Sequence, residues 1–140
     1  MPHTNPSPKI FKTTHRCSFI ELDPFGHMNT VYYLAHYIEH RFTGMREESG
    51  LDLKAIEQLP LVFVTRDLKI DFLRSVQGDG VFHIESYVSG WHEKECRVVC
   101  KMTSEDGKLF SKCEFTFTCI LKETKKPGPW PEGTKELFFH

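Results

Sequence analysis

The spacing of apolar residues changes twice along the chain. Residues 10–22, IFKTTHRCSFIEL, are rich in β-branched and aromatic side chains and predict a first strand. From Val31 the apolar residues recur at intervals of three and four, which predicts an amphipathic helix of roughly four turns that should end at Gly50. The stripe expected to face the core consists of Val31, Leu34, Ala35, Ile38, Phe42 and Met45.

From Leu61 onward apolar and other residues alternate, which is typical of strands with one buried face. The four segments are LVFVTRDLKIDFL, VFHIESYV, CRVVCKM and LFSKCEFTFTCIL. The connections QGDG, SGWHEK and SEDGK are short and rich in Gly, Asp and Ser, so successive strands should pair as antiparallel hairpins. The positions expected to be buried are Val62, Val64, Leu68, Ile70 and Phe72, then Phe82, Ile84 and Val88, then Cys96, Val98, Cys100 and Met102, and finally Leu109, Cys113, Phe115, Phe117, Cys119 and Leu121.

One strand, a long helix and four further strands predict an α+β fold in which a five-stranded antiparallel sheet wraps one central helix. A chain of 140 residues suits one core, and we expect this domain to span residues 10–123. Residues 1–9 should form a flexible N-terminus and residues 124–140 an extended tail. Because long edge strands invite pairing, we expect a homo-oligomer, with dimer and tetramer both open.

Composition and charge exclude several classes of function. The formal net charge is −1 with both signs mixed along the chain, which argues against a nucleic-acid partner. The apolar runs are only a few residues long and the start, MPHTNPSPK, is polar, so we expect a cytoplasmic protein without membrane insertion. Five cysteines without a CxxC pair, in alternating segments, predict reduced core thiols and no metal site.

The segment that precedes the helix concentrates polar and turn-forming residues. Asp23, Pro24 and Gly26 match the first, second and fourth positions of a type I turn, and Asn29 or Thr30 can cap the helix. The first amides of a helix lack partners within it and carry the positive end of its dipole. A nearby carboxylate could attack a carbonyl or activate water while these amides hold the oxyanion. A turn with a cap also explains the same residues without any chemistry.

The motif Asp23-Pro24-Phe25-Gly26-His27-Met28-Asn29, followed by Tyr33, Tyr37 and Glu39-His40-Arg41, resembles the signature of the 4-hydroxybenzoyl-CoA thioesterase family, which has the hotdog fold. The similarity extends from about residue 10 to 122 and includes Lys69-Ile70-Asp71-Phe72, Gly78-Asp79 and Asp106-Gly107. The resemblance implies hydrolysis of an aliphatic or aromatic acyl thioester carried by CoA or an acyl carrier protein. It implies no cofactor other than the coenzyme A of the substrate.

The resemblance also implies roles for residues of this motif. Asp23 would be the nucleophile or the general base, and the amides from Gly26 to Asn29 would polarise the thioester carbonyl at a dimer interface. His27 and Asn29 would bind substrate or shape the turn. Residues expected to contact substrate are Phe25, Met28, Tyr33 and Lys94, although Tyr33 and Tyr37 also suit interface packing.

The turn from Trp91 to Lys94 corresponds to one that carries basic residues for the CoA phosphates in some family members. Only Lys94 is firmly cationic there, and Glu93 would repel phosphate, which leaves open a carrier-protein substrate or a clamp built on Arg74 or Lys101. Trp91 suits an interface or a ligand equally.

Alternative functions use the same residues differently. A hotdog dimer could bind acyl thioesters or partners without hydrolysis, and an enoyl-thioester hydratase would need a paired histidine and acid. The motif His36-Tyr37-Ile38-Glu39-His40 matches H-x-x-E-H of inverted zinc proteases. We interpret it as two surface or interface histidines beside an exposed glutamate, because the helix is needed to cover a sheet.

Overall fold

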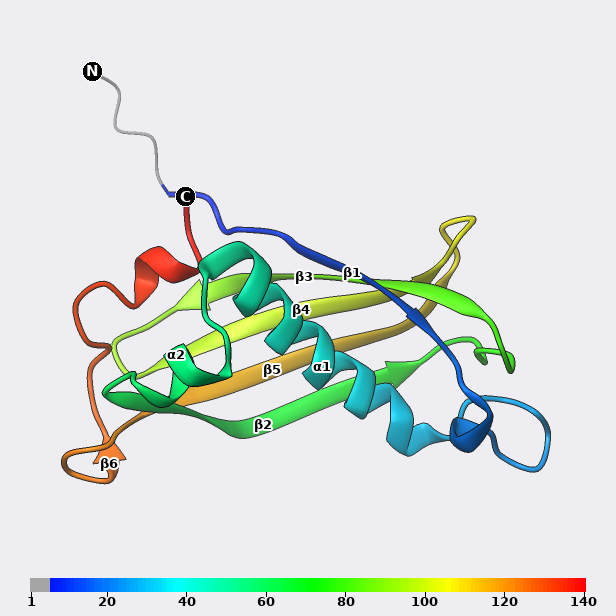
Figure 1. Ribbon diagram of the computed structural model, residues 1–140, viewed down its shortest axis with the longest axis horizontal. Helices are drawn as coiled ribbons and strands as arrows, with labels where there is room; N and C mark the ends of the chain where they lie inside the picture. The colour runs from blue at the N-terminus through cyan, green and yellow to red at the C-terminus, as the bar shows by residue number, and fades with distance from the viewer. Residues whose placement is uncertain (1–5) are drawn as a thin grey trace, which may run out of the picture.

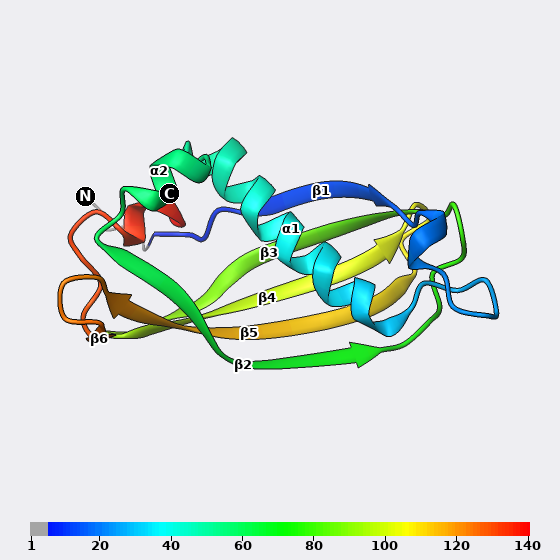
Figure 2. The same cartoon turned by 60° about the horizontal axis from the view of Figure 1, so that its bottom comes forward.

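The computed structural model describes residues 6–140 as a curled antiparallel sheet with one long helix across its inner face (Figures 1 and 2). The helices are α1 (Thr30–Ser49) and α2 (Leu53–Glu57), with 3₁₀ turns at Phe19–Glu21 and Lys135–Leu137. The strands are β1 (Phe11–Arg16), β2 (Leu61–Phe72), β3 (Val81–Trp91), β4 (Glu95–Ser104), β5 (Leu109–Leu121) and the short β6 (Lys126–Pro127). The predicted α+β class, with one central helix, is confirmed.

The strand order is β1-β3-β4-β5-β2, with every neighbouring pair antiparallel and β6 added to β5. The hairpins β3–β4 and β4–β5 are as predicted. The predicted β2–β3 hairpin is wrong, because β1 occupies the edge of β3 and β2 pairs with β5 instead. Residues 73–80 therefore cross the end of the sheet, where Val76 is buried and its carbonyl accepts the Met28 N–H at 2.8 Å.

The first strand is shorter than predicted. β1 ends at Arg16, and residues 19–21 form a 3₁₀ turn that begins with a capping box. In this box the backbone N–H and the hydroxyl of Ser18 both donate to the Glu21 carboxylate, at 3.1 and 2.5 Å. These local hydrogen bonds compete with strand pairing and end it.

In β2 the expected buried face is correct for only part of the strand. Val62 and Val64 are 45% and 42% exposed, whereas Leu61 is buried. A bulge between Thr65 and Asp67 shifts the register of β2 against β5. Because the bulge adds one residue, the alternation of faces before it is out of phase with the alternation after it. After the bulge Leu68 and Ile70 pack against the core as expected, although Phe72 is 49% exposed.

The alternation in β3, β4 and β5 is confirmed where it matters for the core. Phe82, Ile84 and Val88 are buried, together with Phe115 of β5. All five cysteines are buried and free, as expected for reduced core thiols. The sheet thus presents one apolar face to α1.

Helix α1 has the predicted bounds but turns a different face inward. The Asn29 side chain caps its first turn, and Gly50 ends it in the left-handed conformation with φ of 67°. Of the expected core stripe, Leu34 and Met45 are partly buried against the core as predicted, whereas Val31 and Ile38 are 68% and 55% exposed. The residues buried instead are Tyr33, Tyr37, His40, Arg41 and Gly44.

Close packing against β1 explains the choice of face. A Cβ atom at Gly44 would overlap the Phe11 ring and lie 2.8 Å from the Phe11 Cβ, so glycine alone allows α1 to approach β1 this closely.

No helix among residues 6–140 is long and apolar enough to cross a membrane.

Both ends of the described chain meet at one end of the sheet. The tail, expected to be extended, folds back and buries Phe138, whose carbonyl accepts the Lys9 N–H at 2.8 Å. The His140 N–H donates to the Ser7 carbonyl at 2.8 Å. Residues 7–9 of the expected flexible N-terminus are therefore paired with the tail, and residues 1–5 lie outside the described part.

Candidate active site at the start of helix α1

The Asp23 turn is built by hydrogen bonds that begin and end on Asp23 itself. Its carbonyl accepts the Gly26 N–H at 3.1 Å, and Gly26 has φ of 77°, which glycine adopts without strain. The Asp23 Oδ1 atom accepts the N–H groups of Phe25 at 2.8 Å and His27 at 3.0 Å. The predicted turn is confirmed, and the second carboxylate oxygen, Oδ2, has no hydrogen bond to any residue from 6 to 140.

The amides expected to polarise a thioester are mostly occupied. The N–H of Met28 donates to Val76, and that of Asn29 donates to the Glu21 carbonyl at 2.7 Å. Since the N–H groups of Gly26 and His27 bind Asp23, all four predicted donors have acceptors within the chain. The Val31 N–H is taken by the Asn29 cap at 3.2 Å. Thr30, the first residue of α1, has an N–H without an acceptor in the described chain.

The other residues predicted from the motif lie at different depths. Phe25 is 82% exposed, whereas Met28 and Tyr33 are buried in the core. The Tyr33 hydroxyl accepts the Val76 N–H at 3.2 Å and donates to the Arg74 carbonyl at 3.4 Å, and burial raises its pKa. Tyr33 therefore joins the crossing segment to the helix rather than packing at an interface, and substrate contact by Phe25, Met28 and Tyr33 stays a prediction.

Lys94 lies far from Asp23 within one chain. Arg16 and Val81 pair next to the Asp23 end, while Lys94 follows the opposite end of β3, roughly 35 Å away along the strand (Figure 1). Trp91 stacks on Trp130 of the tail at 4.5 Å.

Of the cationic residues considered for phosphate binding, Arg74 is the one that the structure brings to the Asp23 end. The Arg74 carbonyl accepts the Tyr33 O–H close to the helix start, and Arg74 is an exposed residue. Lys101 instead lies within β4, opposite Glu85 of β3.

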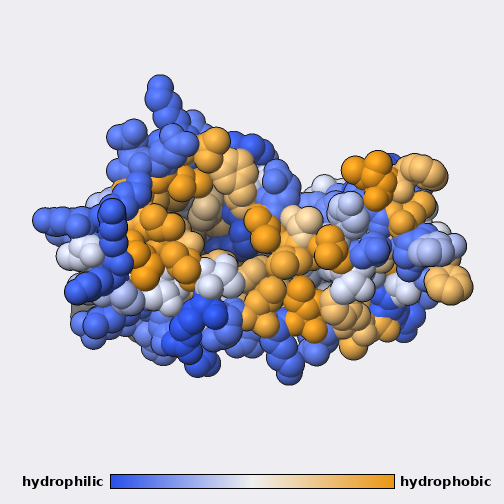
Figure 3. Space-filling model, turned by 90° about the horizontal axis from the view of Figure 1, so that it is seen from below, coloured by the Kyte–Doolittle hydropathy of each residue, from blue (hydrophilic) through white to orange (hydrophobic). Residues whose placement is uncertain are grey.

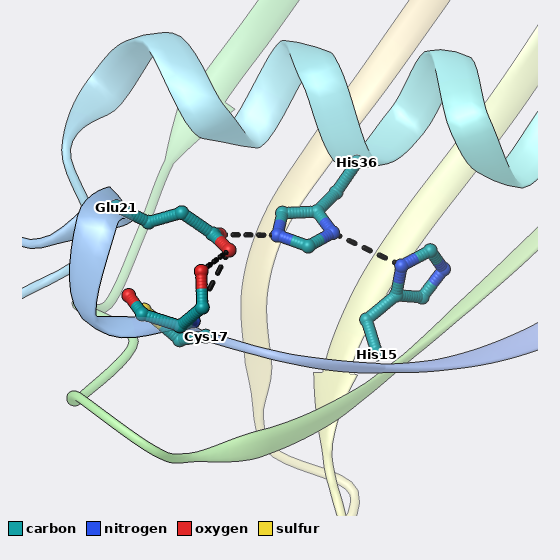
Figure 4. Close-up of polar contacts among 5 residues, drawn as sticks. His15, Cys17, Glu21 and His36 are labelled. Carbon is teal, nitrogen blue, oxygen red and sulfur yellow. Dashed lines mark hydrogen bonds and ion pairs between the residues drawn. The ribbon is translucent and has the colours of Figure 1, made fainter.

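Behind the turn, a chain of polar side chains runs between α1 and the sheet, and Figure 4 shows its first part, from Glu21 through His36 to His15. Glu21 binds His36, whose Nδ1 atom lies 3.0 Å from His15 Nδ1. Thr13 then joins His15 to His40, with both contacts at 2.6 Å. The chain continues from His40 Nε2 to the Ser86 hydroxyl at 2.6 Å and ends at Arg41, which donates to that hydroxyl at 2.9 Å.

One end of this chain, the Arg41 guanidinium, only donates, and the other end, the ionised Glu21 carboxylate, only accepts. Each intervening group can therefore accept from one neighbour and donate to the next. In this arrangement His15 and His40 are neutral, because each donates from one ring nitrogen and accepts at the other. Burial lowers the pKa of His15 to about 4 and that of His40 to about 3, in agreement with neutral rings. Burial alone would raise the pKa of Glu21, but hydrogen bonds from Ser18 and His36 outweigh it and hold that pKa below its usual range.

Sequence reasoning did not find this chain. His36 and His40 were expected at the surface or an interface, yet they point inward, and His40 is fully buried. The available signal was the spacing of four between these histidines and the spacing of two between Thr13 and His15, which places each pair on one face. Glu39 is exposed, as expected.

The same contacts bear on the alternative functions. Glu21 and His36 form the paired acid and histidine that a hydratase requires, but both ring nitrogens of His36 are already hydrogen-bonded within the chain. Among residues 6–140, no group of three or more His, Cys, Asp or Glu side chains is placed to hold a metal ion.

A long helix held by an antiparallel sheet of order β1-β3-β4-β5-β2 is the hotdog fold, and solved structures share it closely. The Staphylococcus aureus protein SAV2348, solved in complex with CoA, superposes with a TM-score of 0.83 at 21% identity over 96% of this chain and 85% of its own. The probable thioesterase YbaW from Escherichia coli gives 0.80 at 21% identity over 91% and 95%. A DHNA-CoA thioesterase from Staphylococcus aureus gives 0.79 at 16% identity over 91% and 85%.

The sequence itself identifies the family. The model of the thioesterase-like superfamily matches residues 17–138, which include the Asp23 turn, the whole sheet except β1, and the tail. The chain belongs to this superfamily, and it is a thioester hydrolase by class. The comparison with curated proteins finds no match.

Proposed function

We propose that this protein hydrolyses acyl-CoA thioesters with Asp23 as its nucleophile or general base. One observation carries the proposal: the Asp23 carboxylate is oriented by two backbone amides, keeps Oδ2 open, and lies beside the start of a long helix. A fixed carboxylate next to a positive helix end suits attack on a polarised carbonyl. Membership in the thioesterase-like superfamily supports this chemistry, and the CoA complex of SAV2348 supports CoA as the carrier.

The proposed reaction uses the geometry of the turn directly. The thioester oxygen accepts the Thr30 N–H at the positive end of α1, in place of the occupied amides from Gly26 to Asn29. As a general base, Asp23 takes a proton from water, the hydroxide adds to the carbonyl carbon, and the C–S bond breaks to release thiol and free acid. As a nucleophile, Asp23 forms a mixed anhydride that water then hydrolyses to the same products.

Release of free thiol from a panel of short, long and aromatic acyl-CoAs tests the role of Asp23. Asp23→Asn retains an oxygen that accepts both turn amides, so the turn should persist while the carboxylate is lost. We expect kcat/KM to fall at least about a hundredfold. Asp52→Asn is a matched control, because Asp52 also accepts a backbone N–H, from Ala55 at 2.8 Å, at the start of α2. Equal activity in wild type and Asp23→Asn would refute the assignment.

The role of the Thr30 amide has its own test. Proline is tolerated at the first position of a helix, and Asn29, with φ of −64° and ψ of 142°, already has the backbone conformation that precedes proline. Thr30→Pro therefore removes this N–H with little change in fold. We expect kcat/KM to fall about a hundredfold, whereas Thr30→Ala should retain activity. Full activity of Thr30→Pro would exclude this amide as the oxyanion donor.

A contact between Arg74 and the phosphates of CoA would distinguish acyl-CoA from thioesters that lack phosphates. We expect an acyl-CoA to be hydrolysed with a lower KM than the same acyl group on N-acetylcysteamine, which lacks phosphates, and Arg74→Gln to reduce this advantage. Lys94→Gln serves as the comparison. A larger effect of Lys94→Gln would place the phosphates of CoA at the far end of the sheet.

We further propose that the active form is a homo-oligomer in which a second copy covers β2 and α1. β2 is an edge strand of 12 residues, and its Val62 and Val64 are exposed. The face in Figure 3 shows apolar side chains gathered around a hollow. Light scattering should show a dimer or tetramer that Val64→Asp dissociates. Leu53→Asp, at a residue that is 61% exposed on α2, should leave the assembly intact. A monomeric wild type would refute the proposal.

A non-hydrolytic acyl-binding role is the second candidate. It is favoured by the internal hydrogen bonds that already engage one Asp23 oxygen and the amides from Gly26 to Asn29. Saturable binding of acyl-CoA without thiol release, in a folded oligomer, would establish this role and exclude the hydrolytic one for the substrates tested.

A further inference from the structure

A cavity of about 270 Å³ lies between the second half of α1 and the sheet, well away from Asp23. Apolar side chains form most of its wall, and the Arg41 side chain also lines it. Arg41 follows Asn29 by twelve residues, which corresponds to about 18 Å along the helix axis. The main apolar contributors are Phe42, Met45, Phe63, Phe115, Phe117 and Phe138.

Arg41 brings a positive charge into this apolar cavity. The residue is only 9% exposed, and no carboxylate in residues 6–140 lies within 4.0 Å of its guanidinium. Burial lowers its pKa to about 10, which still leaves it charged at neutral pH. Its contacts are the Ser86 hydroxyl at 2.9 Å and the rings of Phe11 and Phe138, at 4.5 and 5.9 Å.

A buried cation is nearly always paired with an anion. Two buried thiols, Cys100 and Cys96, act on its charge. Burial raises the pKa of Cys96 to about 12, whereas a hydrogen bond with Cys113 and the charge of Arg41 lower the pKa of Cys100. Glu21, the carboxylate joined to Arg41 through the hydrogen-bond chain, is separated from it by five intervening side chains. The cavity thus combines an apolar wall with a cation that has no carboxylate partner among residues 6–140.

We propose that this cavity is a binding site for an amphipathic carboxylate, with the carboxylate on Arg41 and the hydrocarbon between α1 and the sheet. Arginine binds carboxylates through two parallel N–H···O bonds, which suits this role. An engineered cavity of about 150 Å³ binds benzene, so a volume of 270 Å³ is sufficient for a chain or ring system of about ten carbon atoms. This site lies about 18 Å along α1 from the Asp23 end of the same chain, and its proposed ligand does not depend on hydrolysis.

Calorimetric titration of the intact protein with octanoate and with 1-octanol tests the proposal. The two probes share a hydrocarbon chain and differ in charge. We expect saturable binding of one octanoate per chain, at least tenfold tighter than 1-octanol. Arg41→Met should remove this preference, because methionine retains the apolar stem without the charge. Arg46→Met, at an exposed arginine of the same helix, should leave it unchanged.

Val88→Phe provides a second variant that leaves Arg41 in place. Val88 lines the cavity, so the larger ring should fill part of it and weaken both probes at least tenfold. Equal affinity for octanoate and 1-octanol, absence of saturable binding, or a preference that survives in Arg41→Met would each overturn the proposal. So would unchanged octanoate affinity in a folded Val88→Phe protein. No thioester is present in these titrations, so the outcome is independent of the proposed catalysis.

Discussion

The two faces of α1 are the reverse of what their composition suggests. The face against the sheet carries His40, Arg41 and two tyrosines, whereas the opposite face carries Val31 and Ile38, which are more than half exposed. A helix in a monomeric protein ordinarily buries its apolar stripe. The comparison teaches that an apolar stripe identifies a helix face that will be buried, but not whether the same chain or a second copy buries it.

Partners on the sheet explain why the polar face is stable inside. His40 is bound by Thr13 of β1 and Ser86 of β3, and Arg41 shares the Ser86 hydroxyl. Buried polar groups are tolerated when they are hydrogen-bonded. Of the apolar stripe, Leu34 and Met45 are partly buried against the core, whereas Val31 and Ile38 are exposed, which agrees with the proposed second copy.

Gly44→Ala would break the inner packing and should have the largest effect on stability. Alanine normally stabilises a helix by about 1 kcal/mol relative to glycine, yet its Cβ would overlap the Phe11 ring. We expect the free energy of unfolding to fall by about 3 kcal/mol, measured by urea unfolding. Phe11→Leu should lower this free energy less in the Gly44→Ala background than in the wild type. Additive effects of the two substitutions would contradict the proposed contact.

Ala35→Glu would instead disrupt the proposed contact between the outer face of α1 and a second copy. Ala35 is exposed, and glutamate is a good helix former, so the unfolding of the isolated chain should change by less than about 0.5 kcal/mol. A charge buried in an interface costs about 2–5 kcal/mol, so the dissociation constant of the oligomer should rise at least about thirtyfold. Sedimentation equilibrium measures it, with Glu47→Lys, elsewhere on α1, as the control. An unchanged constant would place the interface on another face.

Acid should selectively weaken the inner face. The folded pKa of His40, about 3, lies below the unfolded value of 6.5 because of burial, so the unfolded state binds more protons between these values. The contribution of His40 is present above pH 6.5 and is lost as pH falls. Between pH 6.5 and 5 the free energy of unfolding should fall by about 2 kcal/mol because of His40. His15, which is more exposed, should contribute a smaller decrease. Urea unfolding at both pH values should show it, and His40→Gln should reduce the difference.

Tyr37→Phe should have the smallest effect. The buried Tyr37 and Ser111 hydroxyls lie near each other, and neither makes a hydrogen bond of ordinary geometry in the described chain. Removal of an unsatisfied hydroxyl relieves its desolvation cost, so we expect a change of less than about 0.5 kcal/mol, in the stabilising direction. Ser86→Ala, which removes a hydroxyl that joins His40 and Arg41, should cost more. Thermal unfolding of the two variants would reveal the opposite ranking if this account is wrong.

Local features of the fold could be predicted from the sequence because their causes lie within a few residues. Asn29 caps α1 through its own side chain, and Gly50 ends the helix because it can adopt a positive φ. The Asp23 turn and the alternation in β3, β4 and β5 are equally local. In the candidate site, this reasoning predicted the turn at Asp23 and the helix start that follows it, whereas the role of Asp23 stays a prediction.

The remaining features depend on contacts between distant segments. The amides from Met28 to Asn29 are occupied by Val76 and Glu21, and no local pattern indicates those acceptors. The pairing of β2 with β5 and the bulge near Arg66 reversed the expected face of Val62 and Val64. The Arg41 cavity requires side chains from α1, four strands and the tail.

The sequence by itself determined the α+β class, the bounds of the long helix and the turn that holds Asp23. Only the tertiary structure decided which face of α1 is buried, which amide at its start stays open, and which polar residues form the chain from Glu21 to Arg41. The physical reason is that caps, turns and periodicity arise from neighbouring residues. Burial and hydrogen-bond satisfaction arise from whichever segments the whole chain brings together.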